Sequence, residues 1–199
     1  MIKTLTQRSF PISILNIFGR RNTFKATTLS KASQSRQESN QWLKCHAANI
    51  EGCVLSIGSD TDEDNDGGWY RDYFQKCSSY TTSEATSEFN VDLVLDVRSM
   101  PQIQNDTFDC VFCSGVLEHV DDYLAGLKEI TRILRSGGIL LLGLPFRQAI
   151  HMAPNDYWRF TEHGLRYMLR DDYEILELKS IDNSVPNFPA AYWLKAKKQ

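Results

Sequence analysis

The stretch FDCVFCSGVLEHV, residues 108–120, and the stretch LRSGGILLL, residues 134–142, decide the fold. Residues 108–113 form an apolar run that predicts a buried strand. Between the two stretches Asp121 is the expected N-cap of a helix, whose apolar face recurs at helical spacing at Tyr123, Leu127, Ile130 and Leu134. Residues 139–144 are continuously apolar, as expected for a central strand covered on both faces. The pattern therefore predicts strand, helix and strand in that order.

Shorter runs on both sides continue this alternation. Residues 53–57 are apolar and end in Gly58, which predicts a buried strand followed by a tight turn. The other expected elements are helices at 38–48, 69–76 and 161–170 and strands at 80–83, 91–95, 173–179 and 190–196. Strands that alternate with helices predict a Rossmann-like three-layer α/β/α sandwich with a mostly parallel sheet. No helix separates the last two strands, so we expect them to form an antiparallel C-terminal hairpin.

Charge divides the chain into two parts. The first 36 of the 199 residues carry seven Lys or Arg and no acid, whereas the other 163 carry 15 basic and 25 acidic side chains. We therefore expect a basic N-terminal extension, residues 1–36, and one domain, residues 37–199. Because the domain is acidic, we expect no binding to nucleic acid. The extension fits a loosely packed tail, a surface arm or an organellar transit peptide, so we expect a cytoplasmic protein or, in the last case, an organellar one.

The cysteines and the apolar runs bear on two further classes of protein. Five cysteines, an odd number, are scattered along the chain, which favours reduced thiols over a disulfide framework. Cys110 and Cys113 have CxxC spacing, but a strand turns them to opposite faces, so we expect no metal there. No run of 18 apolar residues occurs, so we expect no membrane span. A monomer or a homodimer is expected.

The quoted stretches, together with the segment PNDYWRFT at residues 154–161, resemble a known family. They are similar to the class I S-adenosylmethionine-dependent methyltransferases, in particular to their small type 11 branch, over about residues 40–198. The resemblance implies S-adenosylmethionine as the cofactor. It also implies in-line transfer of a methyl group to an oxygen or nitrogen of a small-molecule, sugar or lipid-precursor acceptor. Such a reaction depends mainly on alignment and desolvation.

The resemblance assigns roles to residues at the carboxyl ends of the strands, where such sheets bind their ligands. It places Gly58 in a turn whose backbone approaches the cofactor closely. It places Glu84 at the ribose hydroxyls and Asp96 at the adenine amino group. The other positions that it assigns to the cofactor are Val97 beside the adenine ring and Ser114 and Gly115 at the methionine end.

The turn after residues 53–57 departs from the family pattern. Ser56 stands where the family has an acidic residue, and Asp60 stands where it has a second glycine. Either cofactor binding is weaker, or Asp60 and Gly67 replace the lost contacts. A catalytically degenerate Rossmann-like binding module is a separate alternative. Residues 62–67 also match D-x-D-x-D-G, the start of a calcium loop, although Tyr73 occupies the twelfth position, where a Glu should stand. A calcium-binding interaction domain is therefore a further alternative.

Residues 151–161 are the expected lid over the acceptor, because they follow a strand end and are rich in polar and aromatic groups. The candidate catalytic residues are His119, as a possible general base, together with His151, Tyr157 and Arg159. The alternative is that Tyr157 packs against the sheet edge and Arg159 pairs with an acid. Glu118 and His119 also resemble part of the E-x-x-E-H pattern of metal-dependent O-methyltransferases. Gly115 replaces the first Glu of that pattern, which leaves two ligands, with His151 as a third candidate that is distant in the sequence. We therefore expect no metal.

Overall fold

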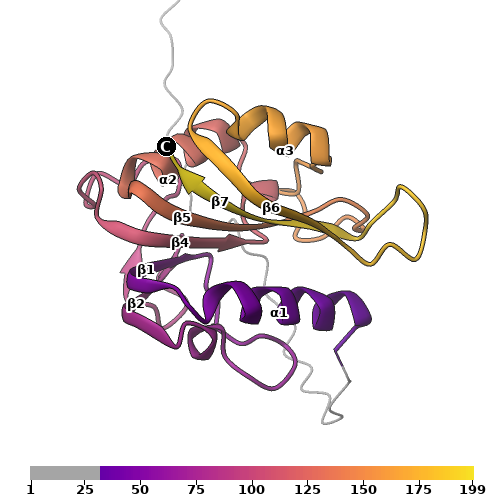
Figure 1. Ribbon diagram of the computed structural model, residues 1–199, viewed down its shortest axis with the longest axis horizontal. Coiled ribbons are helices and arrows are strands. Elements are labelled where there is room, and N and C mark those ends of the chain that lie inside the picture. Colours follow the sequence, from indigo (N-terminus) through magenta and orange to yellow (C-terminus); the bar gives the residue numbers. More distant parts are fainter. Residues whose placement is uncertain (1–31) are drawn as a thin grey trace, which may run out of the picture.

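The computed structural model describes residues 32–199, which form one seven-stranded sheet with helices on both faces (Figure 1). The strand order is β3-β2-β1-β4-β5-β7-β6. Neighbours among β1 to β5 pair in parallel, and β7 is antiparallel to β5 and to β6. The expected sandwich with a C-terminal antiparallel hairpin is confirmed. In chain order the elements are α1 (Gln34–Ala47), β1 (Glu51–Ile57), η1 (Tyr70–Tyr73), β2 (Lys76–Glu84), β3 (Leu93–Val94), β4 (Phe108–Ser114), η2 (Leu117–His119), α2 (Tyr123–Ile133), β5 (Leu134–Pro145), α3 (Glu162–Leu169), β6 (Tyr173–Ile181) and β7 (Ala191–Lys198).

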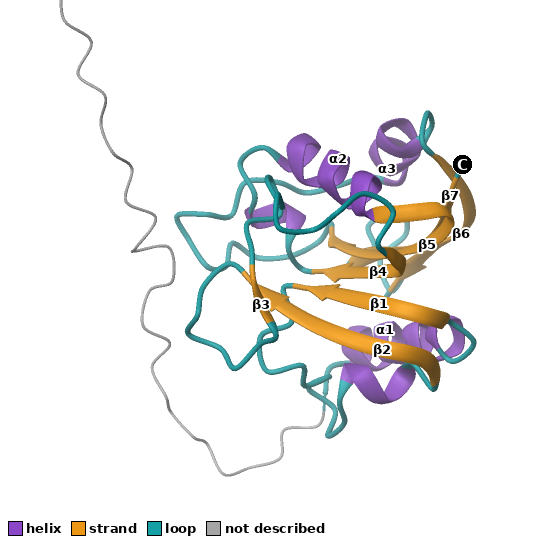
Figure 2. Ribbon diagram, turned by 90° about the vertical axis from the view of Figure 1, so that its left-hand side faces the viewer, coloured by secondary structure: helices purple, strands orange, loops and turns teal. Residues whose placement is uncertain are grey.

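Two apolar cores lie on the two faces of the sheet. Helix α1 covers one face, and α2 and α3 cover the other (Figures 1 and 2). Because side chains alternate along a strand, β4 contributes to both cores. Cys113 packs in the core under α2 and α3, whereas Cys110 packs in the core under α1. The CxxC pair therefore lies on opposite faces as free thiols, as its spacing in a strand predicts.

The connection from β1 to β2 differs from the expectation. A helix was expected over residues 69–76, but only the four-residue 3₁₀ turn η1 forms. Parallel strands are usually joined through a helix that covers the sheet. Here α1 covers that face instead, through the buried Trp42 and Leu43. The residues of η1 are tied to neighbouring elements by their side chains, since Tyr70 packs against Phe112 of β4.

The first helix begins shortly before the expected start of the domain at residue 37. Helix α1 begins at Gln34, where Ser33 caps it by accepting a hydrogen bond from the backbone N–H of Arg36. The Arg36 guanidinium donates to the Tyr70 hydroxyl at 2.9 Å, so Arg36 contacts the fold. The rest of the expected basic extension, residues 1–31, lies outside the described residues. Over residues 32–199, no helix has the length and apolarity needed to cross a bilayer.

Candidate active site

The turns that follow β1 and β4 touch each other at the carboxyl edge of the sheet. Gly58 has a φ of +71°, and the N–H groups of Gly58 and Ser59 both donate to the Ser83 carbonyl of β2. A Cβ on Gly58 would lie 2.2 Å from Cγ2 of Val116, which follows β4. Only glycine combines the left-handed conformation with this close approach. The glycine turn is therefore required by the fold itself.

Glu84, at the end of β2, organises the loop after β1. Its carboxylate accepts the backbone N–H of Asp60 at 2.7 Å and that of Ala85 at 3.2 Å. Asp60 has a φ of +50°. Aspartate tolerates this left-handed conformation better than most side chains. The backbone shape that a second glycine would favour is thus retained at Asp60.

Asp96, which follows β3, is held by an arginine that the sequence analysis missed. Arg98 binds the Asp96 carboxylate through Nε and Nη2, the latter at 2.7 Å, and reaches Asp121 through Nη1. Hydrogen bonding by Arg98 outweighs burial and holds the pKa of Asp96 below its usual range. An Asp-x-Arg sequence at a strand end is the only signal that could have indicated this pair. Val97 is buried in the core and lies against Gly126 of α2.

The remaining residues assigned to the cofactor have different surroundings. Ser56 is only 2% exposed, and its carbonyl accepts hydrogen bonds from the hydroxyls of Ser59 and Ser83. Ser114 lies against Gly143 of β5. Gly115 has a φ of +69°, and the one atom near the position of a Cβ there is Glu118 Oε1, at 3.7 Å. The backbone at Gly115 therefore faces open space, whereas Ser56 does not.

The carboxylates of the acidic loop, residues 60–68, accept hydrogen bonds from the loop backbone and from neighbouring side chains. Asp64 is buried and accepts from the Tyr73 hydroxyl and from the N–H groups of Asp66 and Gly68. Asp62 is buried too, and its partners are the Arg71 guanidinium and the Tyr80 hydroxyl. These carboxylates therefore have protein donors where a calcium loop would present its oxygens to the ion. The calcium interpretation has no support in this arrangement.

Residues 151–161, the lid, are fastened to the turn after β4. The N–H groups of Tyr157 and Trp158 donate to the Glu118 carbonyl at 2.8 and 3.2 Å, and the Trp158 indole donates to the Val120 carbonyl. Val116, in the same turn, is the residue that contacts Gly58. The lid therefore lies at the carboxyl edge of the sheet, next to the glycine turn.

Within the lid, Arg159 and Tyr157 have different environments. The Arg159 guanidinium forms an ion pair with the buried Asp156 carboxylate at 2.6 Å, and this carboxylate also accepts the N–H of His151. Arg159 thus pairs with an acid and shapes the lid. Tyr157 is 46% exposed, and its hydroxyl donates to the Asn155 side chain.

Glu118, His119 and His151 form a cluster, although His151 is distant from the other two in the sequence. One ligand atom from each side chain lies within 4.8 Å of the other two, and the two imidazole rings are 4.7 Å apart at their centroids. Glu118 is 2% exposed, and burial raises its pKa to about 7. Burial also lowers the pKa of His119, which favours the neutral imidazole. His151 reaches the cluster only because the lid folds back over the turn after β4.

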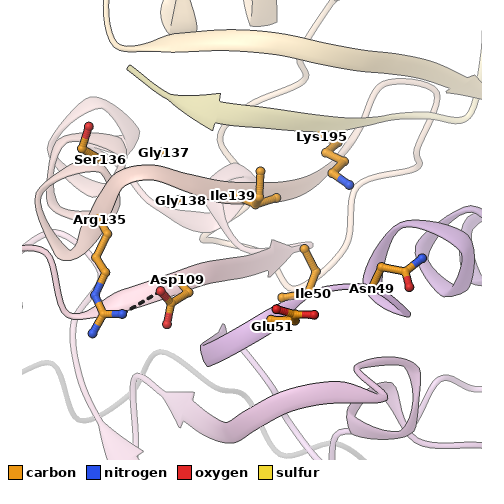
Figure 3. Close-up of a pocket in the computed structure, with 10 residues that line it drawn as sticks. All are labelled: Asn49, Ile50, Glu51, Asp109, Arg135, Ser136, Gly137, Gly138, Ile139 and Lys195. Carbon is orange, nitrogen blue, oxygen red and sulfur yellow. Dashed lines mark hydrogen bonds and ion pairs between the residues drawn. The ribbon is translucent and has the colours of Figure 1, made fainter.

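A polar pocket of about 350 Å³ lies at the opposite end of the sheet, beside the amino ends of β1, β4 and β5 (Figure 3). The ion pair between Arg135 and Asp109 lies at one side of it. Among the residues assigned to cofactor or catalysis, none lines this pocket. It is therefore separate from the candidate active site.

Comparison with known proteins finds one matching family model. Residues 72–142 match the model described as a methyltransferase domain, so this part of the chain is similar to that family. No curated protein matches the chain. The matched residues include β4, α2 and most of β5, the elements on which the resemblance rests.

Solved structures share the fold of this chain at low sequence identity. A Haloferax volcanii methyltransferase, in complex with the Trm112 activator, is 18% identical with a TM-score of 0.62, covering 81% of this chain and 91% of that one. The Burkholderia thailandensis 1,6-didemethyltoxoflavin-N1-methyltransferase, with its substrate and S-adenosylhomocysteine bound, is 19% identical with a TM-score of 0.61, covering 83% and 78%. The [4+2]-cyclase SpnF is 15% identical with a TM-score of 0.63, covering 81% and 80%. Identities this low establish the fold alone.

The residues at the carboxyl edge fit the cofactor of the family. Open space above Gly115 lets a ligand approach the backbone, as the methionine end requires. Glu84 and Asp96 supply carboxylates at the ends of neighbouring parallel strands. Each carboxylate oxygen has two lone pairs, so Glu84 can accept hydrogen bonds from a ribose in addition to those from the backbone. Ser56 and Val97 are buried, and their roles toward the cofactor stay predictions.

Proposed function

We propose that the protein transfers the methyl group of S-adenosylmethionine to an oxygen or nitrogen of a small-molecule acceptor, such as a sugar or a lipid precursor. The observation that carries this proposal is the attachment of the lid to the Glu118 carbonyl, which brings aromatic and polar side chains next to Gly115. The Burkholderia structure, which was solved with 1,6-didemethyltoxoflavin bound, supports a small-molecule acceptor.

In this proposal the cofactor supplies an electrophilic methyl group, and the protein aligns it with the acceptor. Glu84 and Asp96 hold the nucleoside, while the backbone at Gly58 and Gly115 lets it lie close to the sheet. The lid covers the acceptor and excludes water, and Tyr157 is the exposed side chain best placed to contact it. Arg159 acts as a positioning residue through Asp156. Alignment and desolvation account for most of the rate in such a displacement.

Binding of S-adenosylhomocysteine tests the cofactor half of the proposal. We expect it to raise the melting temperature, because a ligand that binds only the folded state stabilises that state. Asp96→Ala and Glu84→Gln should each weaken binding, the former by about 1–3 kcal/mol through the loss of a hydrogen bond to the cofactor. Tyr157→Phe should leave this binding nearly unchanged and lower turnover with an acceptor. Absence of any thermal shift at saturating ligand would contradict the proposal.

A catalytically degenerate binding module is the second candidate. The observations that favour it are Asp60 at the position of the second glycine and a four-residue 3₁₀ turn where a helix was expected after β1. This candidate predicts that S-adenosylhomocysteine binds normally and that no acceptor is methylated. Screening small hydroxylated and amine acceptors with radiolabelled S-adenosylmethionine separates the two candidates, since transfer of label to any of them excludes the degenerate module.

A further inference from the structure

We propose that Glu118, His119 and His151 bind a divalent transition-metal ion. The three side chains come from the turn after β4 and from the lid, and one ligand atom of each lies within 4.8 Å of the others. Glu118 Oε1 lies 4.0 Å from His119 Nε2. Two imidazoles and one carboxylate are a ligand set used by zinc enzymes and by non-haem iron enzymes.

Hydrogen bonds fix the tautomer of both histidines. Nδ1 of His119 lies 2.6 Å from the Asn155 carbonyl oxygen, and Nδ1 of His151 lies 3.1 Å from the Ala149 carbonyl oxygen. Because a carbonyl can only accept, Nδ1 carries a proton in each ring, and in the neutral imidazole the lone pair is then on Nε2. Metal-bound histidines usually have their other ring nitrogen bonded in this way, which orients the ring. The Asp156 carboxylate, 3.4 Å from Nδ1 of His151, adds to this orientation.

Glu118 supplies an independent observation. Its side chain is 2% exposed, and its Oε2 is buried without a hydrogen-bond partner in the structure. Buried carboxylate oxygens are normally paired with donors or coordinate a metal. A cation held by the carboxylate and the two imidazoles would explain why an acid is placed in this position.

The geometry also indicates which ions the site prefers and from which side a further ligand can reach the ion. Ligand atoms about 2.1 Å from a tetrahedral ion are about 3.4 Å apart, so atoms that now lie within 4.8 Å of one another must approach by up to about 1.4 Å when the ion binds. Movement of the lid would bring His151 closer, and small rotations of the Glu118 and His119 side chains would close the 4.0 Å between those two. Imidazole ligands favour zinc, cobalt, iron or nickel over magnesium and calcium. On the side of Gly115 there is open space next to Glu118 Oε1, so a further ligand can enter there.

This opening suggests a role for the ion that rests on the proposed function. Gly115 is the position assigned to the methionine end of the cofactor, so an acceptor oxygen bound to the ion would lie beside the transferable methyl group. The ion would then select acceptors that carry a hydroxyl, and best those with two neighbouring oxygens that can chelate it. The metal site itself does not depend on this role.

Cobalt titration of the full-length protein tests the site. After treatment with a chelator, the protein is titrated with Co²⁺ while its visible absorption is recorded, and Zn²⁺ and Mg²⁺ are then added as competitors. We expect one equivalent of Co²⁺ to bind, Zn²⁺ to displace it and Mg²⁺ to have no effect. We expect Glu118→Gln and His151→Ala each to weaken Co²⁺ binding by at least about 10–100-fold, because the loss of a residue that only orients a metal ligand already has an effect of this size. His163→Ala, an exposed histidine on α3, is the matched control and should bind like the wild type.

The outcomes separate the metal site from the proposed function. Circular dichroism shows whether each variant is folded. If one of Glu118→Gln and His151→Ala unfolds, the other still tests the metal site. S-adenosylhomocysteine binding is measured on the same samples and reports on the cofactor site alone. The proposal is overturned if folded wild-type protein binds no Co²⁺, or if Glu118→Gln and His151→Ala bind it as tightly as His163→Ala does.

Discussion

Buried acidic side chains follow the carboxyl ends of the neighbouring strands β1 and β4, and the two places differ in the hydrogen-bond partners of these side chains. In the acidic loop after β1, Asp62 and Asp64 are buried and accept hydrogen bonds from Arg71, two tyrosines and the backbone. In the turn after β4, Glu118 is equally buried, but its Oε2 has no partner. The loop matches the start of a calcium loop in sequence, but hydrogen-bond donors of the protein occupy its carboxylates. The turn matches only part of a metal-binding pattern, and one oxygen of its carboxylate has no donor.

The difference shows that acidic residues identify a cation site only through their partners. A carboxylate surrounded by donors stabilises the fold, and a cation would have to displace those donors before it could bind. A buried carboxylate that lies beside two imidazoles and has an unpaired oxygen is a poor structural element and a good metal ligand. The first arrangement should therefore matter for stability and the second for binding.

The largest expected effect is on stability, in the acidic loop. Asp64→Ala leaves the Tyr73 hydroxyl and two backbone N–H groups without their acceptor, so we expect the free energy of unfolding to fall by about 3 kcal/mol. Urea denaturation monitored by tryptophan fluorescence measures it. Asp66→Ala, at an exposed position in the same loop, is the control and should change stability by no more than about 0.5 kcal/mol. Equal losses in the two variants would show that the loop is not held through Asp64.

The next effect distinguishes the two groups by their response to ions. We expect Zn²⁺ at 100 times its dissociation constant to stabilise the protein by about 2.7 kcal/mol, because it binds the folded state. Calcium at the same concentration should leave the melting temperature unchanged, because Asp62 and Asp64 already have partners. Thermal unfolding in the presence of each ion provides the measurement. Stabilisation by calcium that Asp62→Asn abolishes would reverse the comparison.

A smaller effect is the response of the acidic loop to pH. Burial raises the pKa of Asp64, but hydrogen bonds from Tyr73, Gly68 and Asp66 outweigh it and hold this pKa below its usual value of 3.8. A depressed pKa in the folded state means that the contribution of Asp64 is complete above pH 3.8 and is lost as the pH falls through the folded value. The difference in unfolding free energy between wild type and Asp64→Ala should therefore shrink on acidification below pH 3.8. A difference that stays constant down to pH 2 would show that the charge of Asp64 is not involved.

The smallest expected effect is that of Glu118→Gln on the metal-free protein. Because Oε2 has no hydrogen bond to lose, we expect the free energy of unfolding at neutral pH to fall by no more than about 1 kcal/mol. Urea denaturation with a chelator present gives this number beside that of Asp64→Ala. A loss as large as that of Asp64→Ala would mean that the carboxylate has a structural partner, and the contrast between the two groups would disappear.

The sequence by itself determined the order of the strands and most of the helices. Apolar runs at residues 53–57, 108–113 and 139–144 are long and regular enough to identify buried strands, and glycine after the first of them marks the turn. Strand periodicity also placed Cys110 and Cys113 on opposite faces. These predictions succeeded because they depend on local spacing, which the sequence contains directly.

Only the tertiary structure decided what each acidic group does. In the sequence Asp62 and Asp64 match calcium ligands, but the fold brings the hydroxyls of Tyr80 and Tyr73 to their carboxylates. Helix α1 takes the place of the expected crossover helix, and its Asn40 side chain donates a hydrogen bond to the Asp64 carbonyl. His151 joins Glu118 and His119 because the lid folds back onto the Glu118 carbonyl. Such contacts join residues far apart in the chain, and their distances follow from packing of the whole domain. No local pattern of residues contains that information.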